Sequence, residues 1–182
     1  AGYDFLGPID THWHTFGYDV GMMNEFYELK PGESIRNVLM YNSPTVILNN
    51  LAKKSNFYSQ EEVKVGFYVS HYGKDHLKNA RLSIRLFKEN TIVFSKAVDL
   101  GFVENGSVSL VHNLQLKMPE VNKPSALKLY VTLEEGELFV ENEWELFVFP
   151  KANLQETNDN VIVSDSLSSN DLKNTLREGK TV

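Results

Sequence analysis

The sequence predicts an all-β fold, an antiparallel β-sandwich of the immunoglobulin or fibronectin type. Between residues 45 and 150, apolar and polar side chains alternate with a period of two in one run after another. The gaps between these runs hold glycine, asparagine and aspartate, which favour turns. About seven such runs fit into about a hundred residues, which is the number and spacing of a two-sheet sandwich. Each strand has one apolar face, and two sheets must meet to bury those faces.

The predicted strands follow in chain order, and their alternation is typical of half-buried antiparallel strands. In the run from Val108 to Leu116, the even-numbered apolar residues are expected on one inward face. In the last run, Phe147 and Phe149 make the strand apolar on both sides. Turns are expected at residues 73–75, 88–90, 104–106 and 135–136. The strands are expected at residues 45–51, 63–70, 81–86, 91–100, 108–116, 127–134 and 143–149.

Residues 1–44 precede the sandwich as an irregular segment rich in aromatic residues. No period persists there, and such rings usually lie against another surface because they must be buried. We expect this segment to be the exit from a preceding domain. A short helix is expected after Pro31-Gly32-Glu33, with Ile35, Val38 and Leu39 on one face.

Residues 151–182 are expected to be a linker followed by the start of an α/β domain. Residues 151–160 are polar, residues 161–165 indicate a strand, and residues 168–178 indicate a helix capped by Ser168 or Ser169. Residues 180–182 would begin a second strand, and a strand–helix–strand unit needs that strand to pair. We therefore expect the chain to be a piece of a longer protein.

The composition narrows the classes of partner. The 182 residues are 42% hydrophobic and 12% aromatic, which is enough to form a core. The net charge of −6 argues against nucleic acid and anionic membrane surfaces as partners. No apolar run is long enough to be a transmembrane helix. The chain has no cysteine, which excludes disulfides and thiolate metal sites and fits either cytoplasm or periplasm.

One candidate metal site is the D-x-H-x-H pattern of Asp10, His12 and His14. Alternate residues of a strand project to one side, so these three side chains would converge on an ion. The alternative is a polar rim on a loop, which Gly7-Pro8 favours, and a metal site would need a further ligand. We favour the rim and predict no metal and no cofactor.

Histidines and carboxylates elsewhere favour structural roles. His71, His76 and His112 are scattered, and His71 and His112 fall on the inward side of their strands, so hydrogen-bonded histidines are expected. The glutamates cluster at residues 61–62, 134–137 and 141–145, on turns or outward strand positions. The two catalytic carboxylates of a glycosidase must face each other across a cleft and have a shifted pKa. We therefore interpret the glutamate clusters as a solvated face. No Gly-rich phosphate loop, G-x-S-x-G or HExxH motif is present.

Outward-facing aromatic residues are the remaining candidate binding groups. Their rings would stack on the apolar faces of sugars or contact a neighbouring domain, and we favour the domain contact. Tyr68, Tyr72 and Tyr130 are the selected candidates for glycan or domain contact. The full set is Tyr68, Tyr72, Phe87, Tyr130, Phe147 and Phe149.

Residues 42–48, 69–80 and 141–150 contain the patterns S-P-T-V, S-H-Y-G-x-x-x-L-x-N-A and N-x-W-x-L-x-V-x-P. In order and spacing, these patterns resemble the accessory region that follows the catalytic barrel in family 2 glycoside hydrolases, the large β-galactosidase-like enzymes of Bacteroides-type bacteria. The resemblance covers most of the chain and rests on structural motifs.

The resemblance implies a non-catalytic immunoglobulin-like sandwich that supports the barrel and the substrate cleft in carbohydrate degradation. The catalytic glutamates of that family lie upstream, and no position here matches them, so the chain alone is expected to be no enzyme. The implied partner is the neighbouring catalytic domain of the same parent chain, with an oligosaccharide as a second partner. The implied parent is secreted or periplasmic.

Two other hypotheses stay open. The chain is either a stand-alone carbohydrate-binding or cell-surface adhesion module, or a small enzyme built around Asp10, His12 and His14. Glycan affinity that is lost on changing Tyr68, Tyr72 or Tyr130 to alanine would favour the module. Stoichiometric metal that His12→Ala removes would favour the enzyme.

Overall fold

The structure, a computed structural model, describes residues 7–10, 21–51, 54–151 and 168–180. The chain divides into two compact units, Ala1–Pro150 and Lys151–Val182. The described part of the first unit holds the helix α1 (Ile35–Tyr41) and eight strands. The strands are β1 (Thr45–Asn49), β2 (Asn56–Tyr58), β3 (Glu62–His71), β4 (Leu77–Lys88), β5 (Thr91–Val103), β6 (Ser107–Lys117), β7 (Ser125–Glu135) and β8 (Leu138–Phe149).

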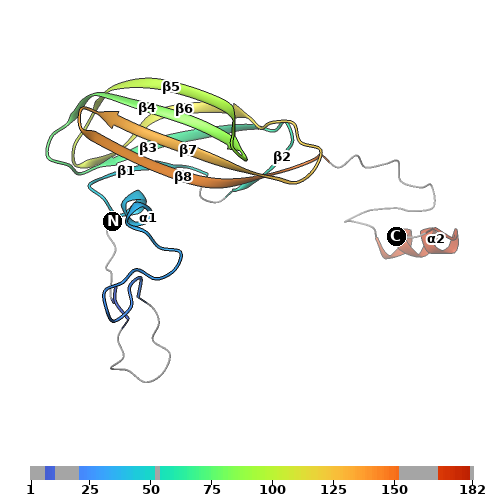
Figure 1. Cartoon of the computed structure of the whole chain (residues 1–182). Helices are drawn as coiled ribbons and strands as arrows, with labels where there is room; N and C mark the ends of the chain where they lie inside the picture. The colour runs from blue at the N-terminus through green and yellow to red at the C-terminus, as the bar shows by residue number, and fades with distance from the viewer. Residues whose placement is uncertain (1–6, 11–20, 52–53, 152–167, 181–182) are drawn as a thin grey trace. The chain divides into compact units, whose positions relative to one another are not determined.

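The strands form two layers, which confirms the predicted all-β sandwich (Figure 1). One sheet has the order β1-β3-β6, and the other has the order β2-β8-β7-β4-β5. All pairs are antiparallel except β2 and β8, which are parallel. Strand β2 is thus a parallel addition at the edge of an otherwise antiparallel sandwich. Strand β2 was not predicted, because three residues are too few to show a period of two.

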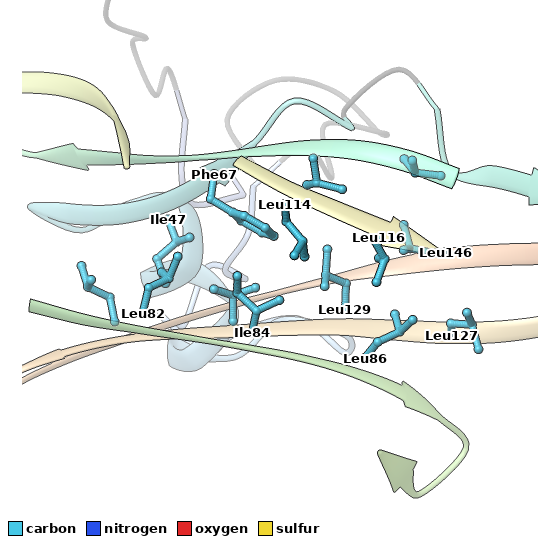
Figure 2. Packing of buried hydrophobic residues seen from close by; sticks show 14 of the residues in the cluster. Ile47, Phe67, Leu82, Ile84, Leu86, Leu114, Leu116, Leu127, Leu129 and Leu146 are labelled. Atoms are coloured by element: carbon cyan, nitrogen blue, oxygen red, sulfur yellow. The ribbon is translucent and has the colours of Figure 1, made fainter. Parts of the chain in front are cut away.

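The inward side chains of both sheets meet in one hydrophobic core (Figure 2). Ile47 and Phe67 of the three-stranded sheet face the interior, as do Leu82, Ile84 and Leu129 of the other sheet, and all five are fully buried. Burying one such side chain stabilises a fold by about 1.5–3 kcal/mol. The alternation in the sequence therefore identified the faces that hold the two sheets together.

Strand β6 departs from its predicted alternation. Leu114 and Leu116 are buried as expected, but Val108 and Leu110 are 54% and 50% exposed. The pairing shifts here, because Phe67 pairs with His112 whereas the next residue, Tyr68, pairs with Leu110. One extra residue in a strand makes a β-bulge and turns the following side chains to the opposite face. The prediction of one continuous inward face is therefore wrong for Val108 and Leu110.

The turns lie where the sequence predicts them. Residues 89–90, 105–106 and 136–137 are turns, and residues 73–75 form a bend. Glu89 and Gly136 adopt positive φ angles of 54° and 57° between hairpin strands. These two positions carry the left-handed backbone that tight hairpin connections need.

Helix α1 confirms the short helix predicted before the sandwich. Ser34 caps it, because the Ser34 hydroxyl oxygen accepts a hydrogen bond from the Asn37 backbone N–H at 3.0 Å. Only Met40 of this helix is buried. Ile35 and Leu39, which were expected on a common apolar face, are 71% and 52% exposed. The apolar face of α1 is thus left largely open.

The second unit contains the helix α2 (Ser169–Arg177), which confirms the predicted helix and Ser168 as its cap. Asp171 lies in the first turn and Arg177 in the last, which suits the helix dipole. The predicted strand at residues 161–165 lies outside the described residues, as do residues 181 and 182. Neither α1 nor α2 is long and apolar enough to cross a membrane, and the described part of the chain holds no other helix.

Candidate functional site

A pocket of about 740 Å³ lies where α1 meets one end of the sandwich. We call it the α1 groove. Helix α1, the residues before β1, the β3–β4 connection and the β7–β8 hairpin all line it. Its apolar lining includes Ile35, Leu39, Met40, Pro44, Leu77 and Phe139, and Arg36, Lys74, Asp75 and Glu141 add charge.

The three segments with the family-like patterns converge on this groove. Pro44 and Thr45 come from the first segment, His71 and Leu77 from the second, and Glu141 from the third. They meet because β1 pairs with β3, which sets Thr45 opposite His71, and because β1 also lies against β8. The sequence did not predict this site, since the segments are far apart along the chain.

His71 joins two walls of the groove. It is 3% exposed. Its Nδ1 lies 2.8 Å from the Thr45 hydroxyl oxygen, and its Nε2 lies 2.7 Å from the Asp75 carbonyl oxygen. A carbonyl oxygen only accepts, so Nε2 donates, and in the neutral ring Nδ1 accepts from the hydroxyl. The prediction of a hydrogen-bonded histidine is confirmed here, and the ring ties β1 to the β3–β4 connection.

Gly73 packs directly on this ring. A Cβ atom at residue 73 would lie 2.8 Å from Cε1 of His71, which is closer than real contacts allow. The ring has no freedom to retreat, because both of its nitrogens are hydrogen-bonded inside the fold. The glycine of the S-H-Y-G pattern is therefore required by the packing of His71.

Asn142 links α1 and β1 to β8. Its side-chain Nδ2 donates to the Met40 carbonyl at 3.1 Å and to the Ile47 carbonyl at 2.9 Å. Its Oδ1 accepts from the Glu143 backbone N–H at 2.9 Å. This role was not predicted from the sequence. The available signal was an amide on the same side of the strand as Trp144 and Leu146, where a polar group needs partners.

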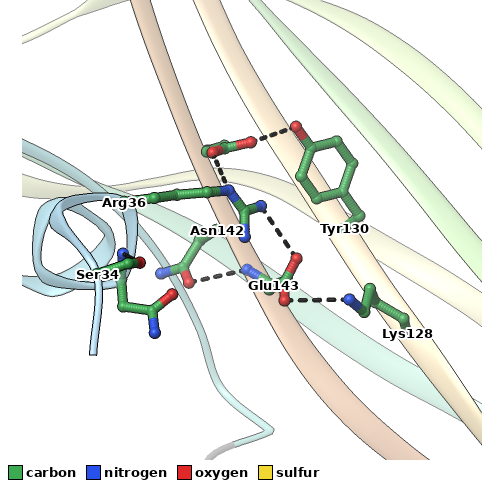
Figure 3. Close-up of polar contacts among 8 residues, drawn as sticks. Ser34, Arg36, Lys128, Tyr130, Asn142 and Glu143 are labelled. Carbon is green, nitrogen blue, oxygen red and sulfur yellow. Dashed lines mark hydrogen bonds and ion pairs between the residues drawn. The ribbon is translucent and has the colours of Figure 1, made fainter. Parts of the chain in front are cut away.

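Arg36 fastens α1 to the outer face of the five-stranded sheet (Figure 3). Its Nε donates to Glu141 and its Nη2 donates to Glu143 at 3.0 Å. Lys128 donates to the other oxygen of Glu143 at 3.1 Å, and the Tyr130 hydroxyl donates to Glu141. One guanidinium thus holds two carboxylates of β8, and both carboxylates also bind side chains of β7.

The network shifts the pKa values of its members. The hydrogen bond from Arg36 lowers the pKa of Glu141, against a smaller opposing effect of burial. Burial raises the pKa of Glu143, but Arg36 and Lys128 together outweigh it and the net pKa is lowered. Burial and the neighbouring Glu141 raise the pKa of Tyr130. Both carboxylates are therefore ionised at neutral pH, whereas a glycosidase general acid needs a raised pKa.

The three selected tyrosines do not share one surface. Tyr68 lies on the outer side of β3 in the three-stranded sheet, and Tyr130 lies on the outer side of β7 in the other sheet. Tyr72 is exposed just after β3. The Tyr130 ring packs edge-on against the Phe87 ring, with the two ring centroids 6.4 Å apart. The Tyr130 hydroxyl donates a hydrogen bond to Glu141. Contact of these tyrosines with a glycan or a domain stays a prediction.

Three exposed aromatic residues lie at the edge of the five-stranded sheet where β2 pairs with β8. Tyr58 of β2 pairs with Phe149 of β8, and Phe147 lies two residues away on the same outer face. All three are exposed. They are the outward aromatics that the last predicted strand indicated, with Tyr58 added by the strand that was missed.

Asp10 is engaged within its own segment. It accepts a hydrogen bond from the Gly21 backbone N–H at 2.7 Å and forms an ion pair with Lys30 at 2.7 Å. The bond from Lys30 lowers the pKa of Asp10. His12 and His14 lie outside the described residues. Within the ranges that the structure describes, no three histidine or carboxylate side chains group as metal ligands.

The two other histidines differ from each other. His76 Nδ1 accepts from the Asn105 backbone N–H at 2.9 Å, as the prediction of hydrogen-bonded histidines requires. His112 does not follow that prediction, because its Nε2 is buried and has no hydrogen-bond partner among the described residues. Burial lowers the pKa of His112, and the nearby charge of Lys96 lowers it further.

A family model and several solved structures match parts of this chain. A family model described as a domain of unknown function (DUF8488) matches residues 61–150. No curated protein matches the sequence. Among solved structures, a β-glucuronidase from Parabacteroides merdae is similar at 17% identity and a TM-score of 0.37, covering 50% of this chain and 12% of that chain. The chain thus spans about an eighth of that enzyme's length.

Two smaller proteins are similar to the same extent. The CARDB domain of a Pyrococcus furiosus protein, in complex with di-metal ions, has 10% identity and a TM-score of 0.40, covering 59% of this chain and 92% of that domain. Superoxide reductase (neelaredoxin) from Ignicoccus hospitalis has 17% identity and a TM-score of 0.34, and the match covers 58% of this chain and 80% of that chain. Similarities at these low scores identify no activity for this chain.

Proposed function

We propose that this chain is a non-catalytic β-sandwich module of a larger carbohydrate-degrading enzyme of the family 2, β-galactosidase-like type. The module packs through the α1 groove against the catalytic domain of the same parent chain. The observation that carries the proposal is the convergence of the three family-like segments on that groove. In this role the parent is a secreted or periplasmic enzyme, and the module supports the substrate cleft.

The polar groups around the groove support a structural role. His71 and Asn142 are bonded to backbone or side-chain groups of neighbouring elements. Arg36 is bound to two carboxylates. These bonds hold α1, β1 and β8 in fixed positions. A groove held this firmly is suited to receive a surface of fixed shape.

The apolar groups around the groove support docking of a protein surface. Ile35, Leu39 and Phe139 line the groove, and each is more than half exposed. Contiguous exposed apolar surface rimmed by charge is typical of protein–protein contacts. Covering the exposed part of each such side chain would favour the contact through the hydrophobic effect.

The test is a pair of substitutions in the parent enzyme. Ile35→Asp with Leu39→Asp places two charges in the groove and is expected to weaken docking, which limited proteolysis or a lower melting temperature of the parent would detect. The isolated chain should keep its own stability, since both side chains are exposed there. The matched control is Ile92→Asp, an exposed apolar residue of β5 outside the groove. If the groove variant and the control behave alike in the parent, the proposed docking surface is wrong.

A further inference from the structure

The turn from Asn24 to Glu28 exposes two consecutive aromatic residues. Phe26 and Tyr27 are each 73% exposed, the highest values among the large apolar side chains of the described residues. We call this turn the aromatic tip. The tip lies within residues 1–44, for which the sequence predicts an irregular segment, and no role was predicted for it.

Hydrogen bonds fix the backbone of the aromatic tip. The Asn24 side-chain oxygen accepts from the backbone N–H groups of Phe26 at 3.0 Å and Glu28 at 2.9 Å. The Asn24 side-chain nitrogen donates to the Glu28 carboxylate at 2.8 Å. The Asn24 backbone N–H also bonds to the Glu28 carbonyl at 2.9 Å. A single asparagine thus closes the turn and leaves the two rings outside it.

Tyr27 is in an uncommon backbone conformation. Its φ angle is 65°, in the left-handed region that bulky residues rarely adopt. Glycine would adopt this conformation without strain. An exposed ring at such a position contributes little to packing, so strain of this kind points to a role in recognition.

We infer that the aromatic tip binds a neutral oligosaccharide. Aromatic rings stack on the apolar faces of sugar rings. Glu25, which is exposed and stands between Asn24 and Phe26 in the sequence, offers a carboxylate acceptor for sugar hydroxyl groups. Protein interfaces are enriched in aromatic residues but depleted of glutamate, so it is Glu25 that favours a sugar over a protein partner. Glu25, Glu28 and the net charge of −6 disfavour an anionic glycan.

The choice of a carbohydrate as the ligand rests on the proposed function, whereas the fixed conformation of the tip rests on its hydrogen bonds.

The test is calorimetric titration of the 182-residue chain with a neutral β-1,4-linked galactohexaose and, separately, with an anionic hyaluronan hexasaccharide. We expect binding of the neutral probe alone. Phe26→Ala with Tyr27→Ala should weaken that binding at least about tenfold, equivalent to about 1.4 kcal/mol. Tyr58→Ala, which removes an exposed ring elsewhere, is the matched control.

A second pair of variants tests whether the fixed turn matters. Asn24→Ala removes the side-chain acceptor and donor while keeping both rings, and it is expected to weaken binding. Asn24→Asp combined with Glu28→Gln exchanges the donor and acceptor groups and keeps the charge, so binding should return. Loss of binding in this exchanged variant would contradict the role of the turn.

Two results would overturn the inference. One is no binding of the neutral probe by the intact chain. The other is unchanged binding after both rings are removed. If removing the rings instead weakens contact with the catalytic domain of the parent, the tip is a protein contact. The proposed function is tested separately at Ile35 and Leu39, so it can stand when this inference fails.

Discussion

His71 shows how one residue shapes the end of the sandwich. Its ring is buried, bonded at both nitrogens, and packed against the backbone of Gly73. A buried hydrogen-bonded ring of this kind holds its neighbours rigidly, since moving it would break two bonds. Both hydrogen-bond partners of the ring, Thr45 and Asp75, also line the α1 groove.

Gly73→Ala should therefore destabilise the sandwich. The added Cβ would meet the fixed His71 ring at 2.8 Å, and overpacking of this kind typically costs about 1–3 kcal/mol. Urea denaturation measures the change in the free energy of unfolding. In a His71→Ala background the same substitution should have a smaller effect, because the ring is gone. Equal effects in both backgrounds would show that the ring is not the obstacle.

His112 makes the stability of the chain depend on pH. Its lowered pKa means that the folded state binds a proton less readily than the unfolded chain does. Stability is therefore unaffected above the ordinary pKa of 6.5 and falls as the pH drops from there toward the lowered value. His112→Gln cannot be protonated, so its unfolding free energy should fall less than that of the unaltered chain between neutral and mildly acidic pH. Parallel pH profiles for the two proteins would contradict this account.

At the scale of elements, Asn142 connects three of them. It holds the last turn of α1 and the middle of β1 to β8 through the carbonyls of Met40 and Ile47. Beside it, Arg36 provides the second attachment of α1. The position of α1, and so the shape of the groove, depends on these two residues of different elements.

Asn142→Ala should loosen α1 from the sandwich. Two backbone carbonyls lose their donor, and a buried acceptor left without one typically costs about 1–3 kcal/mol. We expect lower stability in urea and faster hydrogen exchange across residues 35–41. The control is Gln115→Ala, which removes an exposed hydrogen bond to Glu62 and should change stability by less than about 0.5 kcal/mol. Slow exchange in α1 despite the Asn142 change would disprove the link.

The strands could be predicted from the sequence because each has one buried face, and burial imposes the period of two. The bulge in β6 could not, because an extra residue between Leu110 and His112 changes the pairing without changing the composition. Strand β2 was missed because it has only three residues. Its parallel pairing with β8 requires the chain to pass from the three-stranded sheet to the five-stranded sheet after β1, which no local pattern encodes. The α1 groove was missed because pairing distant strands builds it, although each of its three segments was recognised separately.

At the scale of the whole molecule, the described part of the first unit is a β-sandwich that carries an open apolar groove and an exposed aromatic turn. Both sheets contribute inward side chains to a single buried cluster. The groove and the aromatic tip, in contrast, leave large apolar side chains in contact with water. Exposed apolar surfaces of this kind are typical of contact sites, as the proposed role in a larger enzyme requires.

The sequence of the complete reading frame that contains this chain tests that view most directly. We expect it to encode, before Ala1, a barrel-length catalytic domain with two glutamates placed as a family 2 glycoside hydrolase requires. Such a domain would give the α1 groove its proposed partner. A secretion signal directly before Ala1, with no catalytic domain in the frame, would contradict the proposed function.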